Sequence, residues 1–517
     1  MRPNILLITA DQWRGDCLGI AGHPVVRTPH VDAVAAEATC FSRHFAQAAP
    51  CGPSRACLYT GLYQMTNRVV RNGTPLDHRH DNIALALRRA GYDPTLFGYT
   101  DQAVDPRVHP GDDPWLRTYE GILPGFSVRL RLPEDAGPWL SWLKARGHEV
   151  PDDKWEMYLP VSGPVARRGD PEDGHPTNAP ARYGEDETET AFLTGEFLRW
   201  MGEKAREDAP WCAHISFLRP HPPFVVPEPF NTMYDPADGP AFARAETAAA
   251  ERAIHPLVDY WLAIQRKAEH YVIGAGDGLV ADWTDTDFRQ IRATYWGMVS
   301  EVDRQIGRLV DGLKAAGQWE NTLFVLTSDH GEMMGDHWTL GKFGFHDEAY
   351  HVPLIVRDPS RPEAHGKCIS TFSQNVDIFP TIMEAAGLAP PAHLDGTSLV
   401  PAMEGRGSDR EAVFWEYDFR EVATGDAQAR LGLPMDACNM AVVRTERWKY
   451  VHFAALSPLL FDLENDPGEL VNRAEDPASA AIRIEMAERL LAWRAQHLDR
   501  RLTGIELTPA GLVEGRD

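Results

Sequence analysis

Two acidic motifs each follow a predicted buried strand, and their residue types suit a divalent cation. Asp11 and Gln12 come directly after the apolar run NILLIT, and Asp329 and His330 come directly after the run TLFVL and two further polar residues. The carboxyl ends of the strands in an open α/β sheet are where ligands bind. Two carboxylates, an amide oxygen and an imidazole at that edge predict a site for one divalent metal ion. The alternative is a turn residue at Asp11 and a helix cap at Asp329.

The segment CGPSR places a thiol and an arginine at the start of a predicted helix. Pro53 suits the first turn of a helix, so the side chain of Cys51 would lie at the N-terminus, where free N–H groups and the helix dipole favour an anion. Arg55, one turn further on, offers a forked and permanently charged set of donors for a tetrahedral oxyanion. These residues predict a binding site for a sulfuryl or phosphoryl group. The alternative is a buried thiol beside a structural arginine.

The same pentapeptide matches C-x-P-S-R, and here the chain resembles the formylglycine-dependent sulfatases of the alkaline phosphatase superfamily. In that family the cysteine is oxidised to an aldehyde, formylglycine, by a dedicated formylglycine-generating enzyme, which would be a transient partner. Gln12 and His330 stand where the commonest sulfatases have Asp and Asn, and they resemble the arylsulfatase and phosphonate monoester hydrolase branch. The C-terminal runs WKYVHF and LFDLENDP also look like the family, so the resemblance covers nearly the whole chain.

The resemblance implies a set of metal ligands at matching positions, which are Asp11, Gln12, Cys51 in its modified form, Asp329 and His330. Compared with the commonest sulfatases, this shell loses one carboxylate and gains an imidazole. Because Ca²⁺ prefers oxygen ligands, the change makes the site less suited to Ca²⁺ and more tolerant of Mn²⁺. Both metals stay open at this point.

In the resembling branch a histidine and a lysine contact the scissile group, and the matching positions are His221 and Lys342. We expect Lys342 to neutralise charge on a non-bridging oxygen and His221 to protonate the departing oxygen. Asn72 and Tyr99 fall where the family has pocket residues. The usual signature continues from Gly-Tyr to Gly-Lys-x-His, which this chain lacks, so the catalytic lysine and histidine must come from elsewhere. By themselves, the two residues could also be a solvated lysine and a loop histidine packed by prolines.

The resemblance implies that the hydrated aldehyde attacks sulfur or phosphorus, forms a covalent ester, and then expels sulfate or phosphonate as the aldehyde reforms. That release needs no attack by water at sulfur or phosphorus, so we expect promiscuous hydrolysis of small-molecule esters. We predict an arylsulfatase that also hydrolyses phosphonate monoesters and phosphodiesters. The second hypothesis is that the chain is primarily a phosphonate monoester hydrolase or phosphodiesterase. A two-metal phosphatase or phosphomutase, and a binding protein never oxidised at Cys51, also stay open.

The elements that must position these residues alternate between strand-like and helix-like runs, which is typical of a mostly parallel sheet covered by helices on both faces. The predicted strands are residues 4–9, 93–99, 211–217, 322–327 and 353–357. The predicted helices are residues 29–40, 54–64, 82–90, 187–205, 286–315 and 376–387. We expect an alkaline-phosphatase-like α/β domain over residues 1–400. A smaller α+β domain over residues 401–517 would carry a short antiparallel sheet, a closing helix at 478–498 and a tail.

Composition narrows the class of protein further. The 517 residues, 43% of them hydrophobic, can bury a large core without help from disulfides, and the seven cysteines show no disulfide or zinc pattern. A formal net charge of −24 argues against nucleic acid and an anionic membrane surface as partners. The chain enters a strand without a secretory leader, so we expect a cytoplasmic protein. The family resemblance suggests a homo-oligomer, either a dimer or a tetramer.

Overall fold

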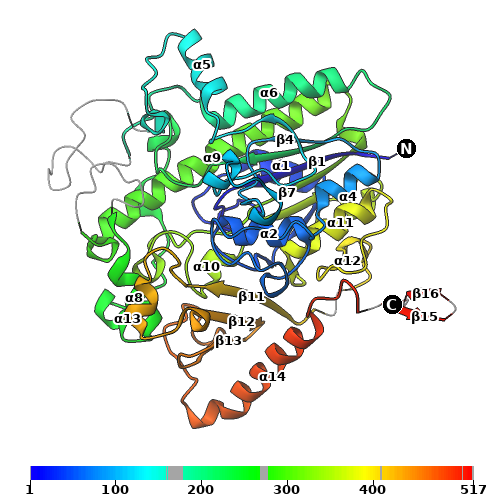
Figure 1. Cartoon of the computed structure of the whole chain (residues 1–517). Helices are drawn as coiled ribbons and strands as arrows, with labels where there is room; N and C mark the ends of the chain where they lie inside the picture. Colours follow the sequence, from blue (N-terminus) through cyan, green and yellow to red (C-terminus); the bar gives the residue numbers. More distant parts are fainter. Residues whose placement is uncertain are drawn as a thin grey trace.

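The central sheet is mostly parallel, as predicted. The computed structural model describes residues 2–158, 160, 178–267, 278–407, 410–503, 505–509 and 511–514. Within these residues the sheet has eight strands in the order β5-β4-β6-β1-β7-β8-β2-β9 (Figure 1). Neighbouring strands run parallel, except that β8 is antiparallel to both β7 and β2.

All the predicted strands are present in the sheet, together with three that were not predicted, β2, β5 and β9. The strands are β1 (Asn4–Ala10), β2 (Thr39–Phe41), β4 (Pro94–Phe97), β5 (Ser127–Leu130), β6 (Cys212–Phe217), β7 (Thr322–Thr327), β8 (Leu354–Arg357) and β9 (Lys367–Ile369). The helix predicted over residues 29–40 was too long, because it ends at Ala36 and residues 39–41 form β2. Thr39 and Cys40 pair with β8, a distant segment that no local pattern reveals.

Helices cover both faces of the sheet. One face carries α1 (Pro29–Ala36), α6 (Glu189–Lys204) and α9 (Asp285–Ala315), and the other carries α2 (Cys51–Thr60), α4 (Ile83–Arg89) and α11 (Ile378–Ala385). Successive side chains of a strand point to opposite faces. In β1, therefore, Leu6 and Ile8 pack in the core of the first group, while Ile5 and Leu7 pack in the core of the second.

Shorter elements lie around this core. The remaining helices of the main body are α3 (Gln64–Asn67), α5 (Gly137–Ala145), α7 (Ala248–Arg252), α8 (Pro256–Ile264), α10 (Asp347–Tyr350) and α12 (Val400–Met403). Two short strands, β3 (His44–Phe45) and β10 (Ser373–Gln374), pair in parallel. Among the described residues no helix combines the length and the apolar character that crossing a membrane requires.

A second, antiparallel sheet follows residue 410, as predicted. It consists of β11 (Ala412–Asp418), β12 (Asn439–Thr445), β13 (Trp448–Phe453) and β14 (Leu459–Asp462), and α14 (Ala480–Gln496) packs against it (Figure 1). A short helix, α13 (Asp426–Leu431), joins β11 to β12. The domain boundary at residue 400 stays a prediction. Phe45 and Tyr350 from the main body stack on Trp415 of β11, so the two parts share one core.

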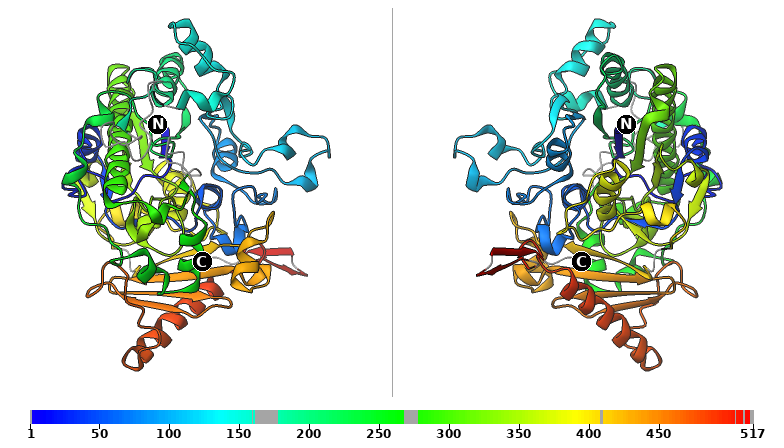
Figure 2. Two further views of the ribbon diagram at one scale, coloured as in Figure 1. Left: turned by 90° about the vertical axis from the view of Figure 1, so that its left-hand side faces the viewer. Right: turned by 90° about the vertical axis from the view of Figure 1, so that its right-hand side faces the viewer.

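The chain ends in a hairpin that projects from the body of the molecule (Figure 2). Its strands are β15 (Ile505–Thr508) and β16 (Gly511–Glu514). Residues 504, 510 and 515–517 of the predicted tail, and residues 408–409 near the start of the second sheet, lie outside the described residues.

Candidate active site

The carboxyl ends of β1 and β7 bring the two predicted metal motifs together. The two strands are neighbours and run parallel, so Asp11 and Asp329, which follow them, meet at one edge of the sheet. The backbone N–H of Gln12 donates to Oδ1 of Asp329 (3.1 Å). Gln12 has a φ of 70°, in the left-handed region that non-glycine residues seldom adopt. Tyr295 of α9 supports this turn, because its hydroxyl donates to the Gln12 carbonyl oxygen (2.8 Å).

Arg55 is fully buried and connects both carboxylates to α2. Its Nε donates to Oδ2 of Asp329 (2.8 Å), its Nη2 to Oδ2 of Asp11 (3.1 Å) and its Nη1 to Oγ of Ser216 (2.7 Å). The guanidinium also lies over the ring of Tyr99, with Cζ 4.2 Å from the ring centroid. Burial opposes the charge, but the neighbouring Tyr99 and Asp329 outweigh it and raise the pKa of Arg55. The site therefore has a permanent positive charge between its two carboxylates.

Cys51 begins α2 and lies against this pair of carboxylates. Its Sγ is 3.9 Å from Oδ1 of Asp11 and 3.1 Å from Nε2 of His330. Burial, followed by the charge of Asp11, raises the pKa of the Cys51 thiol. Asp11, Cys51, Asp329 and His330 are all buried, and each offers one ligand atom within 4.8 Å of the others. The structure thus gathers four of the five predicted metal ligands at one point.

This group of side chains fits a divalent cation. Nδ1 of His330 lies 3.0 Å from the carbonyl oxygen of Gly331 and so carries the proton, which leaves Nε2 as a possible ligand. Burial lowers the pKa of His330, which favours the neutral imidazole that metal binding requires. Asp11 and Asp329 share the single guanidinium of Arg55, so these three buried groups together carry one net negative charge, which favours a cation.

Lys342 reaches the site through Gln12. Its Nζ donates to Oε1 of Gln12 (2.5 Å), and Nε2 of Gln12 in turn donates to Glu332. Glu332 is buried and accepts the backbone N–H groups of Met334 (3.1 Å) and Gly341. Burial opposes the charge of Lys342, but the acidic groups of the site outweigh it and raise its pKa. The Gln12 oxygen that was predicted to bind metal is therefore also the acceptor that holds the Lys342 ammonium in place.

His221 lines the site from the loop that follows β6. Its Nδ1 lies 2.7 Å from the carbonyl oxygen of Pro222, which places the ring proton on Nδ1 and leaves Nε2 as an acceptor. Burial and the positive charge of Lys342 lower the pKa of His221 to about 3. A neutral imidazole in this tautomer is suited to accept a proton at Nε2, whereas the sequence led us to expect a proton donor.

Tyr99 and Asn72 line the cavity as predicted pocket residues would, and both also support the framework of the site. The Tyr99 hydroxyl donates to the carboxylate of Asp11 and accepts from Nη2 of Arg55 (3.1 Å). Oδ1 of Asn72 accepts the backbone N–H of Gly52 (2.9 Å), one of the free N–H groups at the start of α2. Asn72 thus takes up one donor that the sequence analysis had assigned to the anion.

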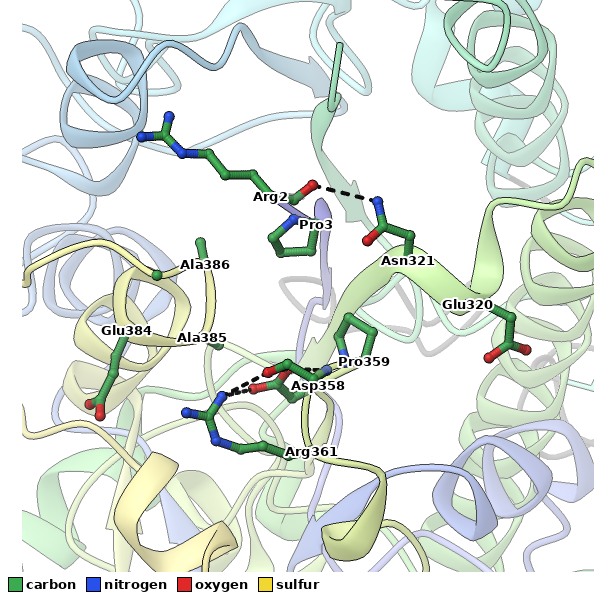
Figure 3. A pocket seen from close by; sticks show the side chains of 12 residues that line it. Arg2, Pro3, Glu320, Asn321, Asp358, Pro359, Arg361, Glu384, Ala385 and Ala386 are labelled. Atoms are coloured by element: carbon green, nitrogen blue, oxygen red, sulfur yellow. Dashed lines mark hydrogen bonds and ion pairs between the residues drawn. The ribbon is translucent and has the colours of Figure 1, made fainter. Parts of the chain in front are cut away.

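A cavity of about 120 Å³ opens over Cys51, and its lining combines polar groups of the site with Tyr119, Pro133 and Leu218. A larger cavity, of about 520 Å³, lies at the opposite edge of the sheet beside Pro3, which precedes β1 (Figure 3). There Nη1 of Arg361 pairs with Oδ2 of Asp358 (2.5 Å). None of the predicted site residues lines that larger cavity, so we place the chemistry in the smaller one.

Three residues of the site had no role in the sequence analysis. Ser216, one residue before the end of β6, accepts a hydrogen bond from Arg55, and Glu332 accepts one from the Gln12 side chain. Asp101 lines the cavity over Cys51. It lies four residues after the end of β4, whereas Asp11 follows β1 directly, and an acidic residue soon after a predicted strand was a signal that could have found it.

Comparisons with known proteins place the chain in a family. The family model described as Sulfatase matches residues 3–388, and the one described as N-sulphoglucosamine sulphohydrolase, C-terminal, matches residues 335–496. The multifunctional alkaline phosphatase superfamily protein PehA of Trinickia caryophylli is 39% identical over 520 residues, which cover 99% of each chain. An arylsulfatase of Clostridium perfringens is 28% identical over 488 residues, 91% of this chain and 90% of that protein.

Solved structures agree with this placement. The phosphonate monoester hydrolase of Agrobacterium radiobacter is 54% identical, with a TM-score of 0.94 and complete coverage of both chains. The phosphonate monoester hydrolase of Silicibacter pomeroyi is 39% identical, with a TM-score of 0.91, and covers 100% of this chain and 99% of that one. The matching family model, the relatives and the shared fold lead to one conclusion: the chain is an ester hydrolase of the sulfatase family, within the alkaline phosphatase superfamily.

Proposed function

We propose that this chain hydrolyses phosphonate monoesters and sulfate monoesters, with phosphodiesters as further substrates, through an aldehyde made from Cys51 and with one divalent cation. The observation that carries the proposal is the buried cluster in which Cys51, at the start of α2, lies against Asp11, Asp329 and His330. We rank phosphonate monoesters first, the reverse of the order expected from the motifs. The reason is that the relative named a phosphonate monoester hydrolase is 54% identical and the arylsulfatase 28%.

Conversion of Cys51 is a two-electron oxidation at Cβ. The C–S bond breaks, oxygen from water replaces the sulfur, and H₂S, two protons and two electrons leave, the electrons passing to an oxidant that the formylglycine-generating enzyme supplies. The hydrated aldehyde then supplies two hydroxyl groups: one attacks sulfur or phosphorus and displaces the alcohol, and loss of a proton from the other releases the acid and restores the aldehyde.

The surrounding side chains divide into positioning and reacting groups. All three nitrogens of Arg55 already donate to protein atoms, so we assign Arg55 the positioning of Asp11 and Asp329 around residue 51. Lys342, a cation, donates to a non-bridging oxygen of the ester and to the departing oxygen. His221 is neutral and its Nε2 is an acceptor. We therefore propose that Nε2 accepts the proton that residue 51 loses in the second step.

The cation would be held by Asp11, Asp329, His330 and the modified residue 51, with Gln12 beside them. When bound, it supplies positive charge that favours the deprotonated form of the attacking hydroxyl. An imidazole in the ligand set favours Mn²⁺ over Ca²⁺, which prefers oxygen ligands. We therefore propose Mn²⁺ as the metal.

Substitution of Cys51 tests the nucleophile. Cys51→Ala removes it, so kcat for 4-nitrophenyl sulfate and for a phenylphosphonate monoester should fall by at least about a hundredfold. Cys51→Ser keeps one hydroxyl but lacks the second, so it should release about one equivalent of 4-nitrophenol and then stop. An aminooxy reagent should label the wild-type chain and neither variant. Cys57→Ala, in the same helix, is the matched control and should keep both activity and labelling.

Other outcomes favour the competing functions. Turnover of Cys51→Ala near the wild-type rate would refute the nucleophile. A chain from its native host that carries an unmodified thiol at position 51 would support a silent binding protein. Two metal ions per chain would support a two-metal phosphatase or phosphomutase.

A further inference from the structure

Asp101 presents a buried carboxyl group to the cavity over Cys51. It follows β4, lines the cavity together with Cys51 and His221, and its side chain is only 5% exposed. Among the described residues its Oδ1 has no hydrogen-bond partner. Buried polar atoms are normally satisfied, so this oxygen is unusual in that the protein offers it no donor that would offset the charge of the carboxylate.

The backbone holds this carboxyl group in place. Asp101 has a φ of 55°, in the left-handed region that Asp and Asn adopt more readily than most residues but that still carries strain. Nε2 of Gln102 donates to the carbonyl oxygens of both Asp101 and Gly52 (2.9 Å each), which ties the turn to the start of α2. The Asp101 side chain is therefore fixed relative to residue 51.

Asp105, a neighbouring aspartate in the same segment, provides a comparison, because both of its carboxylate oxygens have partners within the protein. Asp105 is equally buried, but its Oδ2 accepts from Nδ1 of His78 (2.8 Å) and its two oxygens accept from Arg107. It does not line the cavity over Cys51. Asp101 differs in both respects, because among the described residues its Oδ1 has no partner and the residue lines the cavity over Cys51.

The two cationic side chains near Asp101 are already bonded to other residues. The guanidinium of Arg55 is bonded to Asp11 and Asp329, and the ammonium of Lys342 is bonded to Gln12. Burial raises the pKa of Asp101 to about 7. The positive charges of Arg55 and Lys342 would lower this pKa, but the negative charges of Asp11 and Asp329 offset them. Above that pH the cavity contains a carboxylate without a cation of its own.

We propose that Asp101 is a specificity-determining residue that selects esters by the charge on the group being transferred. Its carboxylate tolerates the single negative charge of a sulfate monoester, a phosphonate monoester or a phosphodiester, and it rejects the double charge of a phosphate monoester. Coulomb repulsion from a fixed negative charge is twice as large for a dianion as for a monoanion at the same distance. This inference rests on the proposed function and names its substrate class: monoanionic esters.

The test compares substrates that share a leaving group and differ in charge. We would measure kcat/KM at about pH 9, where Asp101 is ionised, for 4-nitrophenyl sulfate, 4-nitrophenyl phenylphosphonate and 4-nitrophenyl phosphate. Asp101→Asn removes the charge, keeps the shape and tolerates the positive φ. We expect it to raise the ratio of kcat/KM for the phosphate over that for the sulfate by at least about tenfold. If this variant does not fold, Asp101→Gly also tolerates the backbone and removes the carboxylate.

The control is Asp105→Asn, which removes a buried carboxylate from the same segment. We expect it to lower the melting temperature and to leave the ratio of the two kcat/KM values unchanged. A ratio unchanged in Asp101→Asn, or changed equally in Asp105→Asn, would overturn the role of Asp101 while the proposed function stands. A fully converted wild-type chain that hydrolyses neither monoanionic ester would overturn both.

Discussion

At the scale of single residues, Arg55 balances the buried charges of the site. It is fully buried, and its guanidinium bridges Asp11 and Asp329 on two neighbouring strand ends. Removing one partner of a buried ion pair leaves the other charge uncompensated, which costs far more than the loss of an exposed pair. A divalent cation at the same carboxylates would take over part of this compensation.

Arg55→Met should therefore destabilise the metal-free chain more than the metal-loaded one. We expect the free energy of unfolding to fall by about 3–5 kcal/mol after chelation of divalent cations, and by less in the presence of Mn²⁺. Thermal unfolding of both proteins, with a chelator and with Mn²⁺, measures the difference. For the wild-type enzyme, chelation should abolish turnover and added Mn²⁺ should restore it.

Arg79→Met is the matched control, because Arg79 is 60% exposed and pairs with Asp77 at the surface. It should change the free energy of unfolding by less than about 1 kcal/mol, with or without metal. The shared role of guanidinium and cation would be contradicted if Arg55→Met changed the free energy of unfolding as little as this control does. It would also be contradicted if Mn²⁺ did not raise the free energy of unfolding of the Arg55 variant.

At the scale of elements, α9, which covers one face of the sheet, supports the turn that carries Asp11 and Gln12. Its Tyr295 hydroxyl donates to the carbonyl oxygen of Gln12 and accepts the backbone N–H of Arg14 (3.0 Å), so the helix holds the turn after β1. The same helix carries a buried acidic residue, Glu301, whose Oε1 accepts from the Thr188 hydroxyl (2.6 Å). Burial raises the pKa of Glu301 to about 7.

This raised pKa makes the stability of the chain depend on pH. Below about pH 4.5 Glu301 is protonated in both states and adds no penalty. Between about pH 4.5 and 7 the folded state binds more protons than the unfolded state, so stability falls as the pH rises, and above pH 7 the full penalty is present. Glu301→Gln should stabilise the chain by about 3 kcal/mol at pH 8 and by less than about 1 kcal/mol at pH 5, measured by urea unfolding.

The control for this prediction lies on the same helix. Asp311 is exposed, so Asp311→Asn should change the free energy of unfolding little at either pH. A Glu301→Gln variant whose gain is the same at pH 5 and pH 8 would show that the carboxyl group does not titrate in this window.

At the scale of the whole molecule, the C-terminal hairpin has an exposed apolar face. Leu507 and Leu512 pair across β15 and β16 and so lie on the same face, where they are 82% and 58% exposed. A two-stranded hairpin is marginally stable at best in water. We propose that this face docks on a second copy of the chain. This contact would hold together the homo-oligomer that the family resemblance suggests.

Replacing both leucines tests this docking. The intact chain should form a dimer or tetramer by light scattering, and the double variant Leu507→Ser with Leu512→Ser should shift toward the monomer, because the apolar area that is buried between copies is lost. Val422→Ser, at an exposed apolar residue elsewhere on the surface, should leave the assembly unchanged. An intact chain that is monomeric at all concentrations would rule out the proposed docking.

The sequence by itself determined which residues stand at the carboxyl edge of the sheet. An apolar run followed by an acidic residue indicates a strand end, and the preference of helix starts for proline places Cys51 at an N-terminus. These are local patterns, so one chain suffices to recognise them. The central strands and the long helix α9 could be predicted in this way, whereas the family resemblance implied that Cys51 joins Asp11, Asp329 and His330 in one cluster.

Only the tertiary structure decided how the remaining groups act. The antiparallel direction of β8, the link from Lys342 through Gln12 to Glu332, and the unpaired carboxyl group of Asp101 depend on contacts between segments far apart in the chain. The tautomer of His221 likewise follows from a carbonyl group that its loop brings within reach. Burial and hydrogen-bond partners set the charge and proton position of each group, and both arise only when the chain has folded.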